Sequence, residues 1–338
     1  MIYIQSIAFI LAYIFFIFFF KKTNFFNSEK FPHQNFTSKN FVLPIGGYLI
    51  IIFFILFGFE NIDISFIYIL IIFLIGALSD LKKFNSPKYR LIAQSLIIIV
   101  FIVYFDMKII STRITFLDYF LKNYYLSIFF IAFCFLVLMN GTNFIDGLNG
   151  LVILYFLIII LILNLSGINF ELNKNNFFID NILPILIILL ILNIFNKIYL
   201  GDSGSYLIGF LFSYYLISIY EQNQIISPFF IILLLWYPCF ENLFSILRKQ
   251  KFKKSAVEPD TKHFHQLLYF FFTKKFKNQN KILVNIFTSI VINIYNFTIL
   301  YIGSKYFTKT NIQVLLILTS LTIYLFLYFI LFKYRYKR

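Results

Sequence analysis

The sequence predicts an all-α, polytopic membrane protein with about 10–11 transmembrane helices. Two observations support this fold class. Of the 338 residues, 61% are hydrophobic and 13% are charged, and the mean hydropathy is +0.86. Long apolar runs also recur along the whole chain, and one of them, 182–194, contains no charged residue. Soluble domains of this length do not carry so many such runs.

A helix needs roughly 17–25 apolar residues to cross a bilayer. Runs of about that length predict the following spans, in chain order: 2–20, 44–59, 64–79, 89–105, 123–140, 148–165, 181–196, 203–220, 226–247, 282–303 and 311–332. The first run lacks a basic leader and a small-residue cleavage site, so we expect a retained span and not a signal peptide. No repeat or linker divides the chain, so residues 1–338 are expected to form one domain.

The Lys and Arg residues orient these spans, because cytoplasmic loops are enriched in positive charge. With a cytoplasmic C-terminus, most of the 29 Lys and Arg residues lie in the inside segments. The net charge of +15 is therefore interpreted as positive-inside bias and as attraction to anionic membrane lipids. No nucleic-acid-binding motif accompanies this charge.

Three aspartates lie at the ends of apolar runs and are the most informative polar residues. Asp80, Asp146 and Asp202 occur in the strings GALSDLKKF, NGTNFIDGLNG and LGDSGSYLIGF. The predicted orientation places all three at the cytoplasmic face, where we expect the active site. Acids in the outside loops lack a comparable framework of Gly and Asn and are interpreted as solvated charges.

Two of these strings suit a phosphorylated ligand. The Gly and Asn residues around Asp146 permit close approach of a ligand to the backbone, and GDSGS begins a helix whose N-terminus favours phosphate. A carboxylate at Asp202 suits magnesium, which prefers hard oxygen donors and phosphates. A purely structural interpretation also stands: Asp146, Asp202 or Ser203 as an N-cap of the following helix.

The long inside loop adds two histidines to the same face. His263 and His265 have no third soft ligand nearby, so the sequence disfavours zinc and favours contacts to phosphate oxygens. Two exposed histidines without a role are the alternative. Acids, magnesium and phosphate-binding cations on one membrane face together describe phosphoryl transfer.

In their order along the chain, these motifs resemble the polyprenyl-phosphate N-acetylhexosamine-1-phosphate transferases of glycosyltransferase family 4. The resemblance covers about residues 33–268 and is carried by His33 followed by PIGG, GALSDLKKFNSPKYRLIAQ, NGTNFIDGLNGL, NIFNKIYLGDSGS, PCFENLFSILRK and PDTKHFHQLL. The closer branch is the one that primes O-antigen, common-antigen or teichoic-acid synthesis.

This resemblance implies an enzyme of the bacterial inner membrane. It implies transfer of a sugar-1-phosphate from a UDP-N-acetylhexosamine to undecaprenyl phosphate, with Mg²⁺ as cofactor and UMP as the released product. The product would be undecaprenyl-pyrophosphate-sugar, which primes a cell-envelope polysaccharide. The sugar, the polymer and the oligomeric state, including a homodimer, stay open.

The resemblance also implies roles for individual residues. Asp202 would hold Mg²⁺ together with Asp80, and Asp80 would position or deprotonate the acceptor phosphate. The other predicted contacts are Lys83 and Arg90 to phosphate charge, Asn143, Asp146 and Asn193 to the nucleoside, Tyr199 to the uracil ring, and His263 and His265 to the donor phosphates or sugar.

Two departures from the family pattern leave alternatives open. Ser79-Asp80 stands where the family has paired aspartates, and His265-Gln266 replaces its second histidine pair. A lipid phosphate with a second pKa of about 6 is mostly dianionic at neutral pH, so the chemistry does not require a strong base. The alternatives are an inactive polyprenyl-phosphate-binding relative and a phospho-MurNAc-pentapeptide transferase, which the histidine pattern disfavours. A transporter is disfavoured because its polar groups would lie near the bilayer midplane.

Overall fold

The computed structural model describes residues 2–23, 42–58, 63–84, 86–167, 177–251, 262–277 and 279–336. Within these ranges the secondary structure is helical, with no strand, which confirms the all-α prediction. The helices are α1 (Ile2–Lys22), α2 (Gly46–Phe57), α3 (Ser65–Asp80), α4 (Pro87–Tyr104), α5 (Thr115–Leu121), α6 (Tyr124–Ile145), α7 (Leu151–Leu165), α8 (Phe177–Ile194), α9 (Gly201–Gln222), α10 (Pro228–Leu234), α11 (Trp236–Lys251), α12 (Phe264–Lys275), α13 (Lys281–Ser304) and α14 (Thr310–Tyr336).

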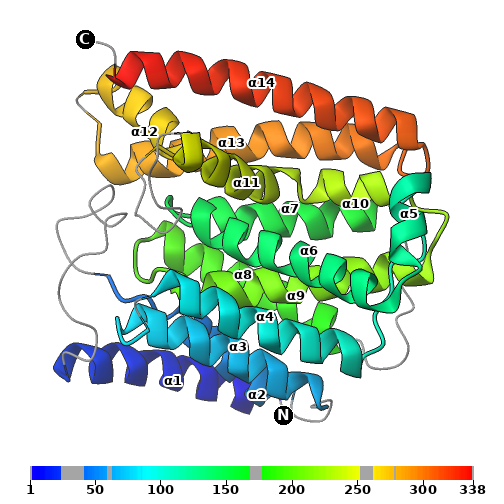
Figure 1. The fold of residues 1–338 in the computed structure, drawn as a ribbon. Coiled ribbons are helices and arrows are strands. Elements are labelled where there is room, and N and C mark those ends of the chain that lie inside the picture. Colours follow the sequence, from blue (N-terminus) through cyan, green and yellow to red (C-terminus); the bar gives the residue numbers. More distant parts are fainter. Residues whose placement is uncertain are drawn as a thin grey trace.

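Most of these helices lie side by side along one direction. In Figure 1, α1 and α2 form one edge, α6 to α9 lie in the middle, and α13 and α14 form the opposite edge. Five described helices are long and apolar enough to cross a membrane, and the bent pair α10 and α11 raises this number to six. Several shorter apolar helices accompany them. The protein is therefore a multi-pass membrane protein, while the number of eleven crossings stays a prediction.

Each predicted span coincides with helical structure, but one of them is broken. The predicted span 226–247 consists of α10 and α11, which meet at Leu235 and are bent by 75°. A helix break leaves backbone carbonyls without partners, and these are costly inside a membrane. The hydroxyl of Tyr155 on α7 donates a 2.8 Å hydrogen bond to the carbonyl of Leu234 and satisfies one of them.

Helix α9 is the centre of the bundle and is buried along most of its length. It packs against α3 and α6, and glycines allow the backbones to approach closely. A Cβ atom at Gly76 of α3 would lie 2.4 Å from Cα of Ser203, and one at Gly209 would lie 2.6 Å from Cα of Met139. Since Asp80 follows Gly76 by one helical turn, this contact brings Asp80 over the N-terminus of α9.

Candidate active site

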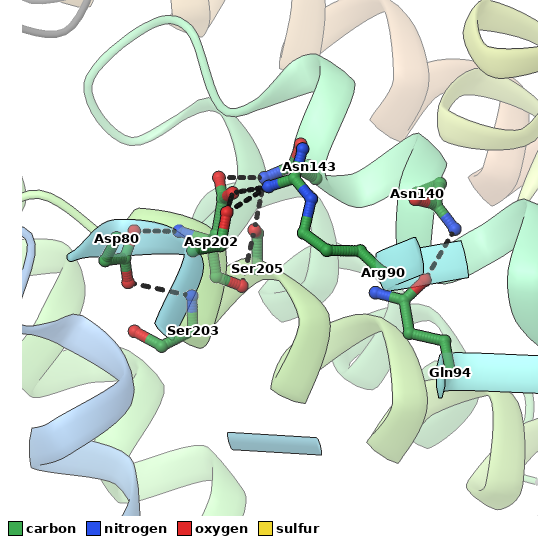
Figure 2. Close-up of polar contacts among 9 residues, drawn as sticks. Asp80, Arg90, Gln94, Asn140, Asn143, Asp202, Ser203 and Ser205 are labelled. Atoms are coloured by element: carbon green, nitrogen blue, oxygen red, sulfur yellow. Dashed lines mark hydrogen bonds and ion pairs between the residues drawn. The ribbon is translucent and has the colours of Figure 1, made fainter. Parts of the chain in front are cut away.

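The site lies where four helices end or begin at the same end of the bundle. Asp80 ends α3, Arg90 lies in the first turn of α4, Asn143 lies in the last turn of α6, and Asp202 lies in the first turn of α9. Figure 2 shows the polar side chains of these helices converging on Asp202. The structure thus brings together four of the predicted site residues.

Asp80 closes the N-terminus of α9. Its Oδ1 accepts the backbone N–H of Asp202 at 2.8 Å, and its Oδ2 accepts that of Ser203 at 3.0 Å. Gly201 has φ +75°, and a Cβ there would lie 2.9 Å from Asp80 Oδ2. The carboxylate that caps α9 therefore comes from another helix, and not from Asp202 or Ser203 as in the structural interpretation of GDSGS.

The carboxylate of Asp202 points into the space between the four helices. Its Oδ1 accepts a 2.7 Å hydrogen bond from Nδ2 of Asn143. Its Oδ2 accepts hydrogen bonds from the Ser79 hydroxyl and from Nη1 of Arg90, the latter at 2.7 Å. The Asp202 side chain is 30% exposed, whereas the Asp80 residue is only 4% exposed. Of the two predicted metal ligands, Asp202 is thus the accessible one.

Arg90 also donates to the hydroxyl of Ser79, the residue that stands where the family has a first aspartate. The guanidinium, the Ser79 hydroxyl and the Asp202 carboxylate form a closed polar triangle between α3, α4 and α9. Among the described residues, the carboxylate that pairs with Arg90 is that of Asp202.

The carboxylates of this site fit a magnesium ion that takes most of its ligands from substrate phosphates and water. Among the described residues, no group of three or more His, Cys, Asp or Glu side chains surrounds a metal position. Magnesium, however, commonly binds to one or two carboxylates together with substrate phosphates and water. The partly exposed Asp202 carboxylate supplies such a ligand, while both oxygens of Asp80 already accept hydrogen bonds from the backbone.

A second polar layer, which sequence reasoning missed, lies one helical turn deeper in the bundle. Nδ2 of Asn140 donates to Oε1 of Gln94 at 3.2 Å, and Gln94 is fully buried (Figure 2). Gln94 follows Arg90 by four residues on α4, and Asn140 precedes Asn143 by three on α6. Residues three or four apart on a helix share a face, so the positions of Arg90 and Asn143 could have predicted this layer.

The loop between α6 and α7 is built by its own turn formers. Gly150, with φ +78°, is the N-cap of α7, so the interpretation of Asp146 as that N-cap is wrong. Asp146 instead follows the last residue of α6 and is partly buried. Burial, with the charge of Asp202 as a second cause, raises the pKa of Asp146 to about 8.

Asn193 holds this loop from the side of α8. Its Oδ1 accepts the backbone N–H of Gly150 at 2.6 Å, and its Nδ2 donates to the carbonyl of Ile198 at 3.0 Å. Tyr199 is buried and pairs through its backbone with Leu43, whose carbonyl lies 2.9 Å from the Tyr199 nitrogen. Asn193 therefore connects two loops, and the Tyr199 backbone is anchored beside the PIGG segment.

Lys83 lies exposed in the turn that follows α3. Its neighbour Lys82 has φ +56°, and the backbone N–H of Lys83 donates to the carbonyl of Leu78, which ends the helix tightly. His33 and most of the inside loop before Lys262 lie outside the described residues.

The two histidines are buried, so the alternative of two exposed histidines is wrong. His263 is 6% exposed and His265 is fully buried. Their rings stack with centroids 5.7 Å apart, and the ring of Phe144 lies 5.4 Å from that of His263. A Cβ at Gly147 would lie 2.3 Å from Nε2 of His265, so the glycine makes room for this imidazole. The histidines thus dock on the last turn of α6 and on the loop that follows it.

Comparisons with known proteins identify similar sequences. The sequence model of glycosyl transferase family 4 matches residues 62–220, which include all the predicted site residues except the two histidines. The chain is also 27% identical over 276 residues to the undecaprenyl-phosphate alpha-N-acetylglucosaminyl 1-phosphate transferase of Thermotoga maritima. That alignment covers 81% of each chain.

Fold, site and comparisons together define a multi-pass membrane enzyme that transfers phosphorylated sugars. More particularly, the match of residues 62–220 to glycosyl transferase family 4 and the similarity to the Thermotoga maritima enzyme support the family indicated by the motifs.

Proposed function

We propose that this protein transfers an N-acetylhexosamine-1-phosphate from a UDP-sugar to undecaprenyl phosphate and releases UMP. The name of the relative from Thermotoga maritima supports the acceptor and the transferred group, since it gives undecaprenyl phosphate and N-acetylglucosaminyl 1-phosphate. The observation that carries the proposal is the Asp202 carboxylate, which lies at the N-terminus of a buried helix beside an arginine and an asparagine. The product would prime a cell-envelope polysaccharide, such as an O-antigen.

The reaction is a substitution at phosphorus. An oxygen of the acceptor phosphate attacks the phosphorus that carries the sugar, and the bond from this phosphorus to the bridging oxygen breaks. UMP leaves with the electron pair of that bond. Since the acceptor phosphate, with a second pKa of about 6, is mostly dianionic at neutral pH, the attack needs no strong protein base.

Asp202 would hold Mg²⁺ against the donor pyrophosphate. When bound, the ion neutralises charge on the phosphates and so favours the attack. Arg90 and the exposed Lys83 would neutralise further phosphate charge. Asp80 acts in this proposal through Asp202, because both of its oxygens hold the first turn of the helix on which Asp202 lies.

The donor would lie across the loop between α6 and α7. Asn143 and Asp146 would contact the nucleoside, with Asn193 and Tyr199 behind them. His263 and His265 would contact the donor phosphates or sugar. Phe144, whose ring lies 5.4 Å from that of His263, directly follows Asn143 in sequence, and Asn143 donates to Asp202, which supports this arrangement. The water-soluble donor implies a cytoplasmic site, hence a cytoplasmic C-terminus and a bacterial inner membrane.

The test is release of UMP by the purified full-length protein in vesicles that contain undecaprenyl phosphate and Mg²⁺. A panel of UDP-N-acetylhexosamines identifies the sugar. We expect turnover with at least one of them and loss of turnover in Asp202→Asn. An absence of UMP release across the panel would favour the inactive lipid-binding alternative, and near-normal turnover of the variant would overturn the role of Asp202.

A further inference from the structure

A buried carboxylate outside the region matched by the family model contacts residues 262–265, the segment that leads into α12 and is called the histidine loop below. Glu241 lies in α11 and is fully buried. Its Oε1 lies 3.0 Å from Nδ1 of His263 and accepts the backbone N–H of Phe264 at 3.3 Å. Its Oε2 accepts the hydroxyl of Tyr324, on α14, at 2.7 Å. One carboxylate thus joins α11, the histidine loop and α14.

A second contact of the same kind lies further along α11. Nη1 of Arg248 donates to the carbonyl of Lys262 and to the hydroxyl of Tyr328, both at 3.0 Å. Glu241 and Arg248 are seven residues apart on α11, and Tyr324 and Tyr328 are four residues apart on α14, so each pair lies on one helical face. These four side chains hold the loop on both sides of His263.

The carboxylate determines which nitrogen of His263 carries a proton. A buried carboxylate is costly unless it accepts hydrogen bonds, and an ionised carboxylate is only an acceptor. Nδ1 of His263 is therefore the donor to Glu241. The other nitrogen, Nε2, then points away from Glu241, because the two nitrogens lie on different edges of the imidazole ring.

The orientation of the ring matters because of what lies beside it. His263 stacks on His265 and packs against Phe144, which directly follows the Asp202 partner Asn143 in sequence. A rotation of the His263 ring would change both contacts. The hydrogen bond to Glu241 therefore sets the ring in the position from which its Nε2 can face a ligand.

We propose that Glu241 is a positioning residue that sets the tautomer and orientation of His263, with Tyr324 holding the carboxylate from behind. The catalytic consequence rests on the proposed sugar-phosphate transfer, whereas the tautomer itself does not.

The tautomer can be measured directly, since the chain has only three histidines. The full-length protein is labelled with ¹⁵N-histidine, reconstituted in lipid vesicles and studied by solid-state NMR, and His263→Gln assigns the signals of His263. In the wild-type protein we expect a protonated Nδ1 hydrogen-bonded to a carboxylate. A neutral His263 ring with its proton on Nε2 alone would overturn the proposal, whether or not the protein releases UMP.

Variants then test the role of Glu241. We expect Glu241→Ala to change the Nδ1 signal of His263 and to lower kcat for UMP release roughly 10- to 100-fold, as for outer partners of other functional histidines, with little change in KM for the lipid acceptor. Glu241→Gln retains an acceptor oxygen. We expect this variant to keep most of the wild-type Nδ1 signal of His263 and most of the wild-type kcat. An unchanged Nδ1 signal in Glu241→Ala would contradict the proposal.

The matched control lies one turn along α14. Tyr324→Phe and Tyr328→Phe each remove a hydroxyl from the same helix, but the Tyr324 hydroxyl donates to Glu241, whereas the Tyr328 hydroxyl accepts from Arg248. We expect Tyr324→Phe to alter the Nδ1 signal of His263 more strongly than Tyr328→Phe does. Both variants keep the aromatic ring, so they test the proposal even if Glu241→Ala does not fold. Equal spectra for the two tyrosine variants would argue against the proposal.

Discussion

Nη1 of Arg90 lies 2.7 Å from Oδ2 of Asp202, so the carboxylate proposed to bind magnesium already has a cation beside it. The two charges balance each other in the absence of substrate. A metal ion must share the carboxylate with the guanidinium or displace it. This relationship makes the magnesium dependence of the enzyme sensitive to Arg90.

We therefore expect Arg90→Gln to have two opposite effects. Turnover should fall about 100-fold, because a charge that stabilises phosphate is lost. The Mg²⁺ concentration for half-maximal activity should fall, because Asp202 loses its competing cation. Both follow from UMP release measured over a range of Mg²⁺ concentrations. Lys88→Gln, which removes an exposed charge from the same helix, is the control and should change neither value substantially.

Ser79→Asp tests the departure from the paired aspartates. The new carboxylate would lie beside Arg90 and Asp202, since the Ser79 hydroxyl contacts both. An added oxygen ligand should lower the half-saturating Mg²⁺ concentration several-fold. Ser79→Ala removes the hydroxyl without adding charge and should leave this concentration nearly unchanged. Identical magnesium titrations for all three proteins would refute the link between position 79 and the metal.

Asp80→Asn tests the cap on α9. Asparagine has one acceptor oxygen, so one of the two backbone N–H groups would lose its partner. We expect a loss of about 1–3 kcal/mol in the free energy of unfolding and a loss of turnover per folded molecule. The control is Asp118→Asn on α5, where the carboxylate accepts hydrogen bonds from Ser111 and Thr112. It should lower the Tm but leave turnover per folded molecule unchanged.

The stability of the metal-free protein should depend on Asp146. Burial raises its pKa from the usual value of about 4 to about 8. Between these values the folded state binds a proton that the unfolded state lacks, so stability from this group is present at low pH and is lost as pH rises towards 8. In EDTA, the wild-type Tm should fall more steeply between pH 6 and 8 than that of Asp146→Asn. Parallel curves of Tm against pH for the two proteins would contradict the raised pKa of Asp146.

The positions of the helices could be predicted because the hydropathy of a span is a local property. The break at Leu235 could not, since the Tyr155 hydroxyl that satisfies the neighbouring Leu234 carbonyl lies 79 residues away along the chain. The short helices α5 and α12 also escaped prediction. The seven residues of α5 are too few for a span, and α12 carries charged residues at its end.

Residue type and order along the chain were enough to place Asp80, Arg90, Asn143 and Asp202 on one face and to identify the family. The sequence alone could not say in which direction each carboxylate points. Only the tertiary structure turns both oxygens of Asp80 to the backbone of α9 and leaves Asp202 accessible. Glu241 lies in the string PCFENLFSILRK, but its contacts could not be predicted because its partner Tyr324 lies 83 residues away along the chain. Composition determines which segments enter the membrane, whereas the role of a polar group depends on neighbours that only packing supplies.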